Sequence, residues 1–266
     1  MESKLTKALA DLKMGIARWR IWFMMAYQDI QLRYRRSVLG PFWLTLSMAI
    51  TIYTMGFLYG KLFHMDLEVY YPYLAGGMLT WGLIASVITD SADAFIDAGP
   101  VMQQIKMPIT LYVHRILLRN FLIFLHNVVV IIPILLIFHA HAKLNLNILL
   151  LPLGLLLIYI FGFIYGLIIA IFCARFRDIS QIVKSLIQVI FFVTPIMWMP
   201  QSLPEHYHTL LYLNPFYSLI QLVRSPLTGF TPSLWAYEIT IALILIGSTF
   251  ALWLFSTYRS RIIYWI

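Results

Sequence analysis

Three arginines within four positions, Arg33, Arg35 and Arg36, are the residues of this sequence with the clearest potential for chemistry. The guanidinium group is planar and forms paired hydrogen bonds with phosphate or carboxylate oxygens, so the cluster could bind an anion. Gly40 and Pro41 follow and break the chain before an almost uncharged apolar run. Basic residues also gather beside membrane-spanning segments on the cytosolic side, so simple anchoring is the alternative.

The sequence lacks the signatures of common catalytic sites. It has no GxxxxGK[ST] phosphate loop and no HExxH, CxxC or GxSxG motif. Its 11 carboxylates lie outside the apolar runs or near their ends, whereas ion-coupled carriers usually keep an ionisable group at mid-membrane. The deepest polar residues are His126, Asn127 and Gln188. We therefore expect no catalytic residue, no metal site and no cofactor on this chain.

The composition is that of a membrane protein. Hydrophobic residues make up 61% of the 266 positions, charged residues make up 11%, and the mean hydropathy is +0.83. Soluble domains carry about 25% charged and about 45–50% apolar residues. A fold of this size cannot bury so much apolar surface away from water, so lipid must cover part of it.

Six apolar runs are long enough to cross a bilayer, which requires roughly 20 residues per helix. They cover residues 39–60, 72–95, 114–138, 148–172, 180–199 and 233–256. The runs are continuous rather than alternating, which favours helices over the strands of a membrane barrel. The sequence thus predicts an all-α integral membrane protein, with a cytosolic amphipathic helix and basic loop over 1–36 and one six-helix domain over 37–266.

Lysine and arginine residues are distributed unevenly between the predicted faces. Most of the 19 lie in the N-terminal segment, in the C-terminal tail, and in or beside the loops after the second and fourth runs. Because basic residues stay in the cytosol, both termini are predicted to be cytosolic. This distribution explains the net charge of +8 without a single basic patch, so it argues against nucleic acid as a partner.

The N-terminal segment predicts an amphipathic helix. Large apolar residues recur at steps of four and three: Leu5, Leu9, Leu12, Ile16, Trp19 and Phe23. The other faces are largely charged, so the helix is expected to lie along the membrane surface. It is either a simple anchor or a docking surface for a cytosolic partner.

Aromatic residues make up 16% of the chain. Tyr70, Tyr71 and Tyr73 are typical of the aromatic belt at a membrane interface. Others lie within or beside the apolar runs: Trp43, Tyr53, Phe191, Phe192 and Trp198. Aromatic rings stack on the apolar C–H face of sugars, so a pore lined by them would suit a sliding sugar chain. Helix packing explains each of them equally well.

Four groups of motifs resemble one family when they are taken together. They are RYRRSVLGPFW at 33–43, QIKMP at 104–108, ARFRDI at 174–179, and TPI at 194–196 with NPFY at 214–217 and VRSPL at 223–227. In this order and spacing they resemble the membrane subunit of ABC-2 family exporters of lipid-linked polysaccharide. The O-antigen export permeases look closest, with teichoic-acid and other polysaccharide permeases as near relatives.

The resemblance implies an assembly in the bacterial inner membrane. It implies a homodimer bound to two copies of a separate ABC ATPase, and that partner would hold the ATP and magnesium. The translocation channel would lie at the dimer interface, formed largely by the first and fifth spans. The cargo would be a polysaccharide on an undecaprenyl-type lipid, with membrane lipids around the dimer.

The resemblance also implies roles for residues on the cytosolic side. The cargo headgroup carries a pyrophosphate and would meet Arg33, Arg35, Arg36, Leu39 and Gly40. A short helix between Pro100 and Pro108 would couple to the ATPase, and its contact candidates are Val101, Gln104, Ile105, Lys106 and Met107. Asp90, Asp93 and Asp97 share a helix face just upstream, where they either pair with nearby basic residues or attract a basic partner.

The segment 200–232 is too polar and too rich in proline to span the membrane. Two short apolar pieces, 205–213 and 216–224, predict re-entrant helices that form an external gate. The residues assigned to this gate are Asn214, Pro215, Tyr217 and Arg224. The alternatives are an exposed loop for the segment and a snorkelling anchor for Arg224.

Two other functions compete with export. A membrane enzyme acting on lipid-linked sugars would need acids or histidines around a cleft, and only His64, Asp66 and Glu68 cluster in that way. They lie on a short loop, which is too little to build a site. An ion-coupled carrier is disfavoured by the absence of acids from the middle of the spans.

Overall fold

The computed structural model describes residues 3–33, 35, 37, 40, 42–138, 145–202 and 204–266. All regular secondary structure in these ranges is helical. The α-helices are α1 (Lys4–Ala17), α2 (Trp19–Arg33), α3 (Phe42–Leu62), α4 (Leu67–Gln104), α5 (Thr110–Val128), α6 (Ile131–Ile137), α7 (Leu151–Arg175), α8 (Asp178–Val193), α9 (His208–Leu213), α10 (Pro215–Leu227), α11 (Leu234–Tyr258) and α12 (Ile262–Trp265). Short 3₁₀ turns are η1 (Leu146–Leu150), η2 (Pro200–Ser202), η3 (Glu205–Tyr207) and η4 (Arg259–Arg261). The predicted headgroup residues Arg36 and Leu39 lie outside the described residues.

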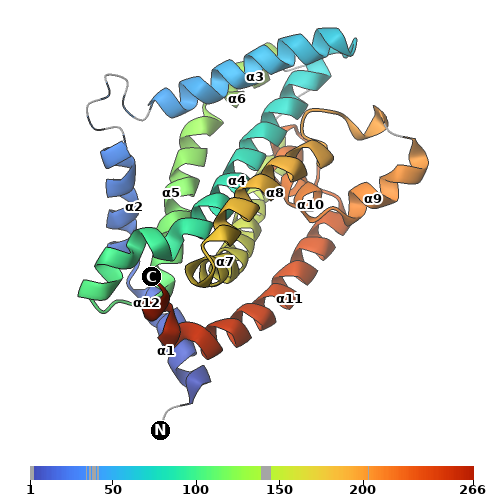
Figure 1. Cartoon of the computed structure of the whole chain (residues 1–266). Helices are drawn as coiled ribbons and strands as arrows, with labels where there is room; N and C mark the ends of the chain where they lie inside the picture. The colour runs from blue at the N-terminus through green and yellow to red at the C-terminus, as the bar shows by residue number, and fades with distance from the viewer. Residues whose placement is uncertain are drawn as a thin grey trace.

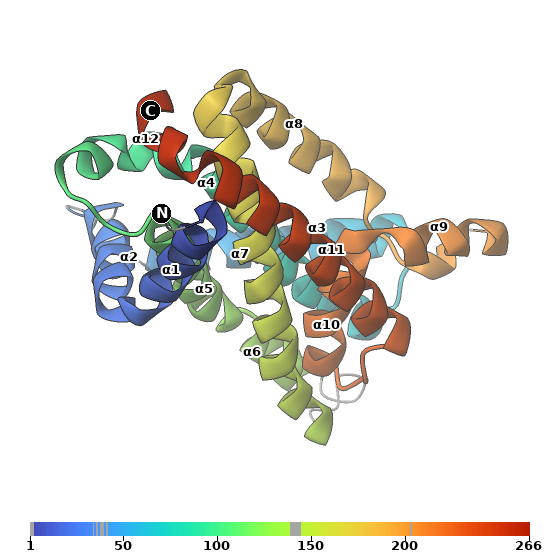
Figure 2. The same cartoon turned by 90° about the horizontal axis from the view of Figure 1, so that it is seen from below.

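The helix bundle has two distinct ends. The helices α1, α2 and α12 and the last turns of α4 lie together at what we call the near end (Figures 1 and 2). The first turns of α4 and the helices α9 and α10 lie at the opposite end, which we call the far end. The N- and C-terminal elements are therefore neighbours, and α1 packs against α11.

Five helical stretches have the length and apolar composition to cross a membrane: Phe42–Leu62, Leu67–Gln104, Thr110–Ile137, Leu146–Arg175 and Leu234–Trp265. They coincide with five of the six predicted runs. The remaining run, 180–199, contains α8, which has only 16 residues and is about 24 Å long. It ends at Val193 because Thr194 has an extended backbone and precedes Pro195, whose ring disfavours the helical conformation there.

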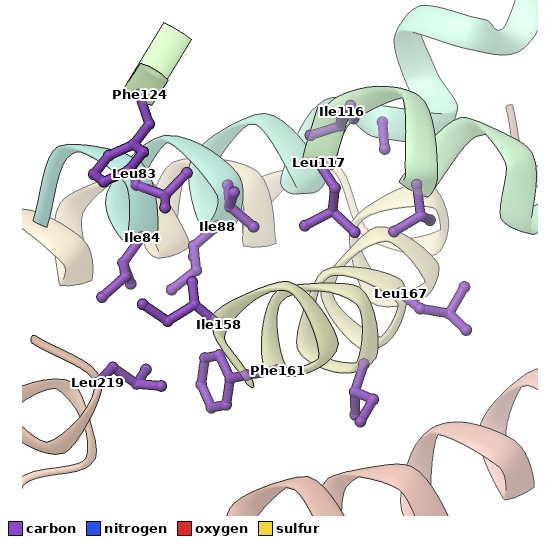
Figure 3. Packing of buried hydrophobic residues seen from close by; sticks show 14 of the residues in the cluster. Leu83, Ile84, Ile88, Ile116, Leu117, Phe124, Ile158, Phe161, Leu167 and Leu219 are labelled. Atoms are coloured by element: carbon purple, nitrogen blue, oxygen red, sulfur yellow. The ribbon is translucent and has the colours of Figure 1, made fainter. Parts of the chain in front are cut away.

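The helix α4 is the centre of the bundle. It packs against α3, α5, α7, α8 and α10, which explains why it is buried around most of its circumference. Figure 3 shows Leu83, Ile84 and Ile88 from α4 close to Leu117 of α5 and Ile158 of α7. This apolar contact fixes the positions of α4 and α5, the two helices that carry most of the candidate site.

The N-terminal segment forms two helices rather than one. The break falls at Arg18, which ends α1 with a non-helical backbone. The large apolar residues of the predicted stripe are mostly exposed, including Leu5, Leu9 and Ile16, which is what a helix on a lipid surface requires. The face of α1 that packs against the protein is instead made of Ala8, Asp11 and Gly15. The small side chains of Ala8 and Gly15 let the neighbouring helices approach α1 closely.

The predicted short helix between Pro100 and Pro108 is wrong in its boundaries. α4 continues through Pro100 to Gln104, and residues 105–108 are not helical. A proline inside a helix removes one hydrogen bond and bends the helix without always ending it. The last turns of α4 accordingly point away from the rest of the helix (Figure 1).

Candidate functional site

A groove of about 460 Å³ lies between α3, α4 and α5. Its polar lining consists of Arg33, Ser47, Thr51, Ser86, Asp90, Asn120 and Asn127. Apolar side chains complete its walls, among them Trp43, Met78 and Phe124. Polar side chains are costly in a lipid environment and usually mark a pathway or binding site, so this groove is the best candidate for a functional site.

The two asparagines of α5 give the groove its hydrogen-bonding character. Asn120 donates from Nδ2 to Asp90 at 2.9 Å and to the Ile116 carbonyl oxygen at 3.1 Å. Asn127 is buried, and its Oδ1 has no hydrogen-bond partner among the described residues. A buried acceptor without a partner is unfavourable, so this oxygen is suited to accept a hydrogen bond from a hydroxyl or amide of a ligand.

The near-end mouth of the groove carries Arg33, one of the predicted basic residues. Arg33 is the last residue of α2 and lines the groove, and both Arg33 and Arg35 are exposed. Gly40 has a φ of 54°, a backbone conformation that favours glycine. The Gly40 N–H donates to Ser37 Oγ at 3.1 Å. The structure thus brings Arg33 and Trp43 to one cavity, although the two residues lie on different helices.

An ion-pair network fixes α2 against the groove. Arg115 donates from Nε to Asp29 at 2.8 Å, which joins α2 to α5. Arg119 bonds Asp29 at 3.3 Å and Asp90 at 2.7 Å, which extends the network to α4. The predicted pairing of the aspartates with nearby basic residues is therefore confirmed for Asp90. It is also confirmed for Asp93, which pairs with Lys184 of α8 at 2.6 Å.

Of the predicted channel aromatics, Trp43 lines the groove, and the other four make contacts elsewhere. Tyr53 donates to the Val130 carbonyl oxygen at 3.3 Å, so it packs between α3 and α6. Phe191 packs against Trp81 of α4 with a ring-centre distance of 5.8 Å, whereas Phe192 is exposed on α8. Trp198 donates to the Phe192 carbonyl oxygen at 3.1 Å. A channel role for these residues stays a prediction, because it concerns an interface between two copies.

The predicted coupling residues lie at the near end. Gln104, Ile105 and Lys106 are exposed, and Val101 and Met107 are half-buried. The chain's C-terminus packs beside them, since the side chain of Gln103 donates to the Ile266 carbonyl oxygen at 3.0 Å. The exposed side chains at the end of α4 are therefore available to a partner protein.

A buried carboxylate holds the loop after α4, residues 105–109, to elements near both ends of the chain. Asp11 of α1 is fully buried and accepts hydrogen bonds from the backbone N–H groups of Ile109 and Thr110, at 3.2 and 3.1 Å. It also accepts from the Thr110 hydroxyl at 2.9 Å and from Arg259 Nε at 2.8 Å. A carboxylate at the start of a helix satisfies unpaired N–H groups and the positive end of the helix dipole. We call these four residues the Asp11 clamp.

The far end carries the predicted gate residues. Two short helices are present, α9 and α10, and Asn214 caps α10 by accepting from the Phe216 and Tyr217 N–H groups. Pro215 occupies the first turn, where its missing N–H costs nothing. Arg224 is only 2% exposed and donates to the Pro195 carbonyl oxygen at 2.8 Å. The snorkelling interpretation of Arg224 is therefore wrong.

Two tyrosines at the start of α4 bond the irregular segment after α8. Tyr70 is fully buried and donates to the Met197 carbonyl oxygen at 2.7 Å. Tyr73 donates to the carbonyl oxygens of Pro195 and Trp198, at 2.9 and 3.1 Å. Their hydroxyl groups satisfy the carbonyls of the irregular segment after α8, which must be paired if the segment lies away from water.

A family model described as ABC-2 type transporter matches residues 20–228. The chain belongs to this family. Two relatives from Klebsiella pneumoniae, both named O-antigen export system permease protein RfbA, are 24% and 25% identical to it over 193 residues. Each alignment covers 73% of this chain and 74% of the relative. A Myxococcus xanthus protein of the same name is 22% identical over 200 residues, with 74% and 75% of the two chains covered.

Several important residues of this ABC-2 permease were missed by sequence reasoning. Asp11 reads as one more polar residue on an amphipathic helix, and its partners at 109, 110 and 259 are far away in the chain. Ser47, Thr51 and Ser86 are small hydroxyl residues scattered through apolar runs, which signals nothing unless the helices are placed. Asn127, in contrast, could be recognised from the sequence as a candidate site residue, because a lone amide deep in an apolar run needs a hydrogen-bond partner.

Proposed function

We propose that this chain is the membrane-spanning subunit of an ATP-driven exporter of lipid-linked polysaccharide of the O-antigen type. Its membership of the ABC-2 family and the names of its relatives support the class. The observation that carries the proposal is the polar groove among the candidate membrane-spanning helices, with Arg33 at its mouth. No observation favours a membrane enzyme or an ion-coupled carrier.

In this proposal the near end faces the cytosol of a bacterium, and the protein lies in the inner membrane. The distribution of lysine and arginine supports this orientation. The helix α8 acts as the fifth span in chain order, with the irregular segment after Val193 completing its passage. The short helices α9 and α10 then re-enter from the outer face as a gate that includes Asn214, Pro215, Tyr217 and Arg224.

The energy source is a partner in this proposal. Two copies of an ABC ATPase hold ATP and magnesium and contact the near end of a permease homodimer. The exposed tip of α4 and the following loop, Val101 and Gln104–Met107, supply the contact. The channel then forms between the two copies, where α3 and α8 contribute Trp43, Tyr53, Phe191 and Phe192, with Trp198 just beyond α8.

In this proposal the groove recognises the cargo. The pyrophosphate of an undecaprenyl-type lipid lies at the headgroup level, where Arg33 and Arg35 are exposed. Guanidinium groups form strong, paired hydrogen bonds with phosphate oxygens. The first sugars then face the hydroxyl and amide groups of the groove, and the lipid tail stays in the bilayer.

Replacing Arg33 and Arg35 together with glutamine is expected to lower export at least about tenfold. The two side chains stay polar and of similar length, but the charge-assisted bonds to phosphate, each worth about 1.5–3 kcal/mol, are lost. The measurement is surface polysaccharide in cells that depend on this permease, beside co-purification of the ATPase as a check on assembly.

The matched control is Arg18→Gln with Arg20→Gln, which removes the same charge from exposed positions at the other end of α2. Export should stay near the level of the unaltered protein in this control. Equal export by the two double variants would contradict the headgroup site, because both would then act only through net charge.

A further inference from the structure

A second cavity of about 340 Å³ lies at the far end, between the start of α4, η2 and α10. Its volume is at the lower end of the range of small-molecule sites, about 300–1,000 Å³. Its lining includes aromatic rings and planar polar side chains in comparable number. It shares no lining residue with the groove at the other end of the bundle.

One wall of this cavity is a ladder of hydrogen bonds along α10. The Ser225 hydroxyl donates to Gln221 Oε1 at 2.8 Å, and Gln221 Nε2 donates to the Tyr217 hydroxyl at 2.8 Å. The three residues are spaced by four, so they lie on one face of the helix. Each bond polarises the next. The ladder ends at the Tyr217 hydroxyl, which also lines the cavity.

The ladder is flanked by a buried cation. Arg224 lies over the ring of Tyr73 at 3.9 Å and near the ring of Tyr217 at 5.6 Å. Its Nη1 is bonded to the Pro195 carbonyl oxygen, but its buried Nη2 has no partner among the described residues. A guanidinium that is 2% exposed and lines a cavity can hydrogen-bond an oxygen-rich ligand there after a small side-chain movement.

The lining favours a neutral ligand over an anion. The carboxylate side chain of Glu68 belongs to the same cavity as Arg224, so both signs of charge border it. A ligand with many hydroxyl groups can donate to an acid or amide oxygen and accept from a guanidinium or amide nitrogen. The ring of Tyr217 stacks on Trp235 with a ring-centre distance of 5.4 Å, which fixes its orientation.

We propose that this far-end cavity binds one pyranose unit of the exported glycan. The ladder of Tyr217, Gln221 and Ser225 bonds the sugar hydroxyls, and the aromatic rings cover its apolar face. The inference rests on the proposed function, since it places a sugar contact at the outer end of the export path. It goes beyond that function in assigning a ligand and a binding site on the far side of the membrane from the groove.

The test is saturation-transfer NMR on the full-length protein in lipid nanodiscs. The probes are the methyl glycosides of galactose, mannose and N-acetylglucosamine, each added separately. We expect saturation of the ring protons for at least one glycoside, and at least a fivefold loss of that signal in Tyr217→Phe and in Gln221→Leu. The matched control is Tyr207→Phe, which removes a phenol hydroxyl at the same end but outside the cavity, and it should retain the signal.

Absence of signal with all three glycosides, or equal signals in the unaltered protein and both cavity variants, would overturn the inference. Surface polysaccharide is measured in parallel with the unaltered gene. If the unaltered protein exports polysaccharide but no sugar binds at the cavity, the inference is wrong and the proposed function is still supported. If the unaltered protein exports no polysaccharide, the proposed function is wrong, whatever the NMR result.

Discussion

Replacing Gly154 with alanine is expected to lower the apparent unfolding temperature by about 5 °C or more. A Cβ at this position of α7 would overlap the carbonyl oxygen of Leu222 and lie 3.0 Å from its carbonyl carbon. Backbone atoms cannot move aside as a flexible side chain can, so α7 and α10 must separate. Overpacking of this kind costs about 1–3 kcal/mol or more, and each kcal/mol corresponds to about 2–4 °C. The measurement is thermal unfolding of the purified protein in nanodiscs.

The matched control is Gly99→Ala on α4. A Cβ there meets only Ile266 Cβ at 3.8 Å, which is ordinary contact. Alanine is also the better helix former, so the control should unfold at or slightly above the temperature of the unaltered protein. Equal temperatures for the two variants would show that α7 and α10 do not touch at Gly154.

Replacing Asp11 with alanine is expected to destabilise the protein by about 3 kcal/mol and to loosen its near end. The change removes the acceptor for two backbone N–H groups, one hydroxyl and the Arg259 guanidinium. Breaking a buried charge pair costs about 3–5 kcal/mol, and the partial exposure of Arg259 places the effect at the lower end. Hydrogen exchange at residues 105–112 should rise together with the loss of thermal stability.

A graded series identifies the cause. Asp11→Asn keeps a carbonyl oxygen for the N–H groups but loses the charge that Arg259 pairs with, so it should fall between alanine and the unaltered protein. Asp178→Ala removes an exposed carboxylate from the start of α8 and should change little. Unchanged exchange at residues 105–112 in Asp11→Ala would contradict the clamp.

The Asp11 clamp gives the amphipathic segment a physical role beyond anchoring. It bonds the backbone immediately after Lys106–Pro108 and the residue that follows α11. One buried carboxylate therefore joins the loop after α4 to α1, to the start of α5 and to the residue after α11.

The membrane-spanning helices were predictable because each is a long apolar run that has no alternative to a helix in lipid. The cap of α10 was also readable, since Asn214 followed by Pro215 is a strong start signal. The ends of α4 were not predictable. Pro72 and Pro100 lie inside the helix, and only the packing of its neighbours decides whether a proline ends a helix or bends it.

The candidate site was only partly predictable for a related reason. Composition identified Arg33 and Trp43, but not that they share a groove with Ser86 and Asn120. A snorkelling anchor was the alternative interpretation of Arg224, whereas the structure buries its side chain against Tyr73. Residue type reports the chemistry that a side chain can do, and long-range contacts decide which side chains do it together.

The most direct test of the central claim is transport by purified components. The permease is reconstituted in vesicles with its ABC ATPase and a fluorescent lipid-linked glycan, and movement of the glycan across the bilayer is followed. The exposed Lys106 of the coupling loop is changed to glutamate in a parallel preparation. We predict movement that requires both the ATPase and ATP, and that falls at least about fivefold in Lys106→Glu with reduced ATPase binding. Movement at the same rate by the permease alone, without ATPase or ATP, would contradict the account.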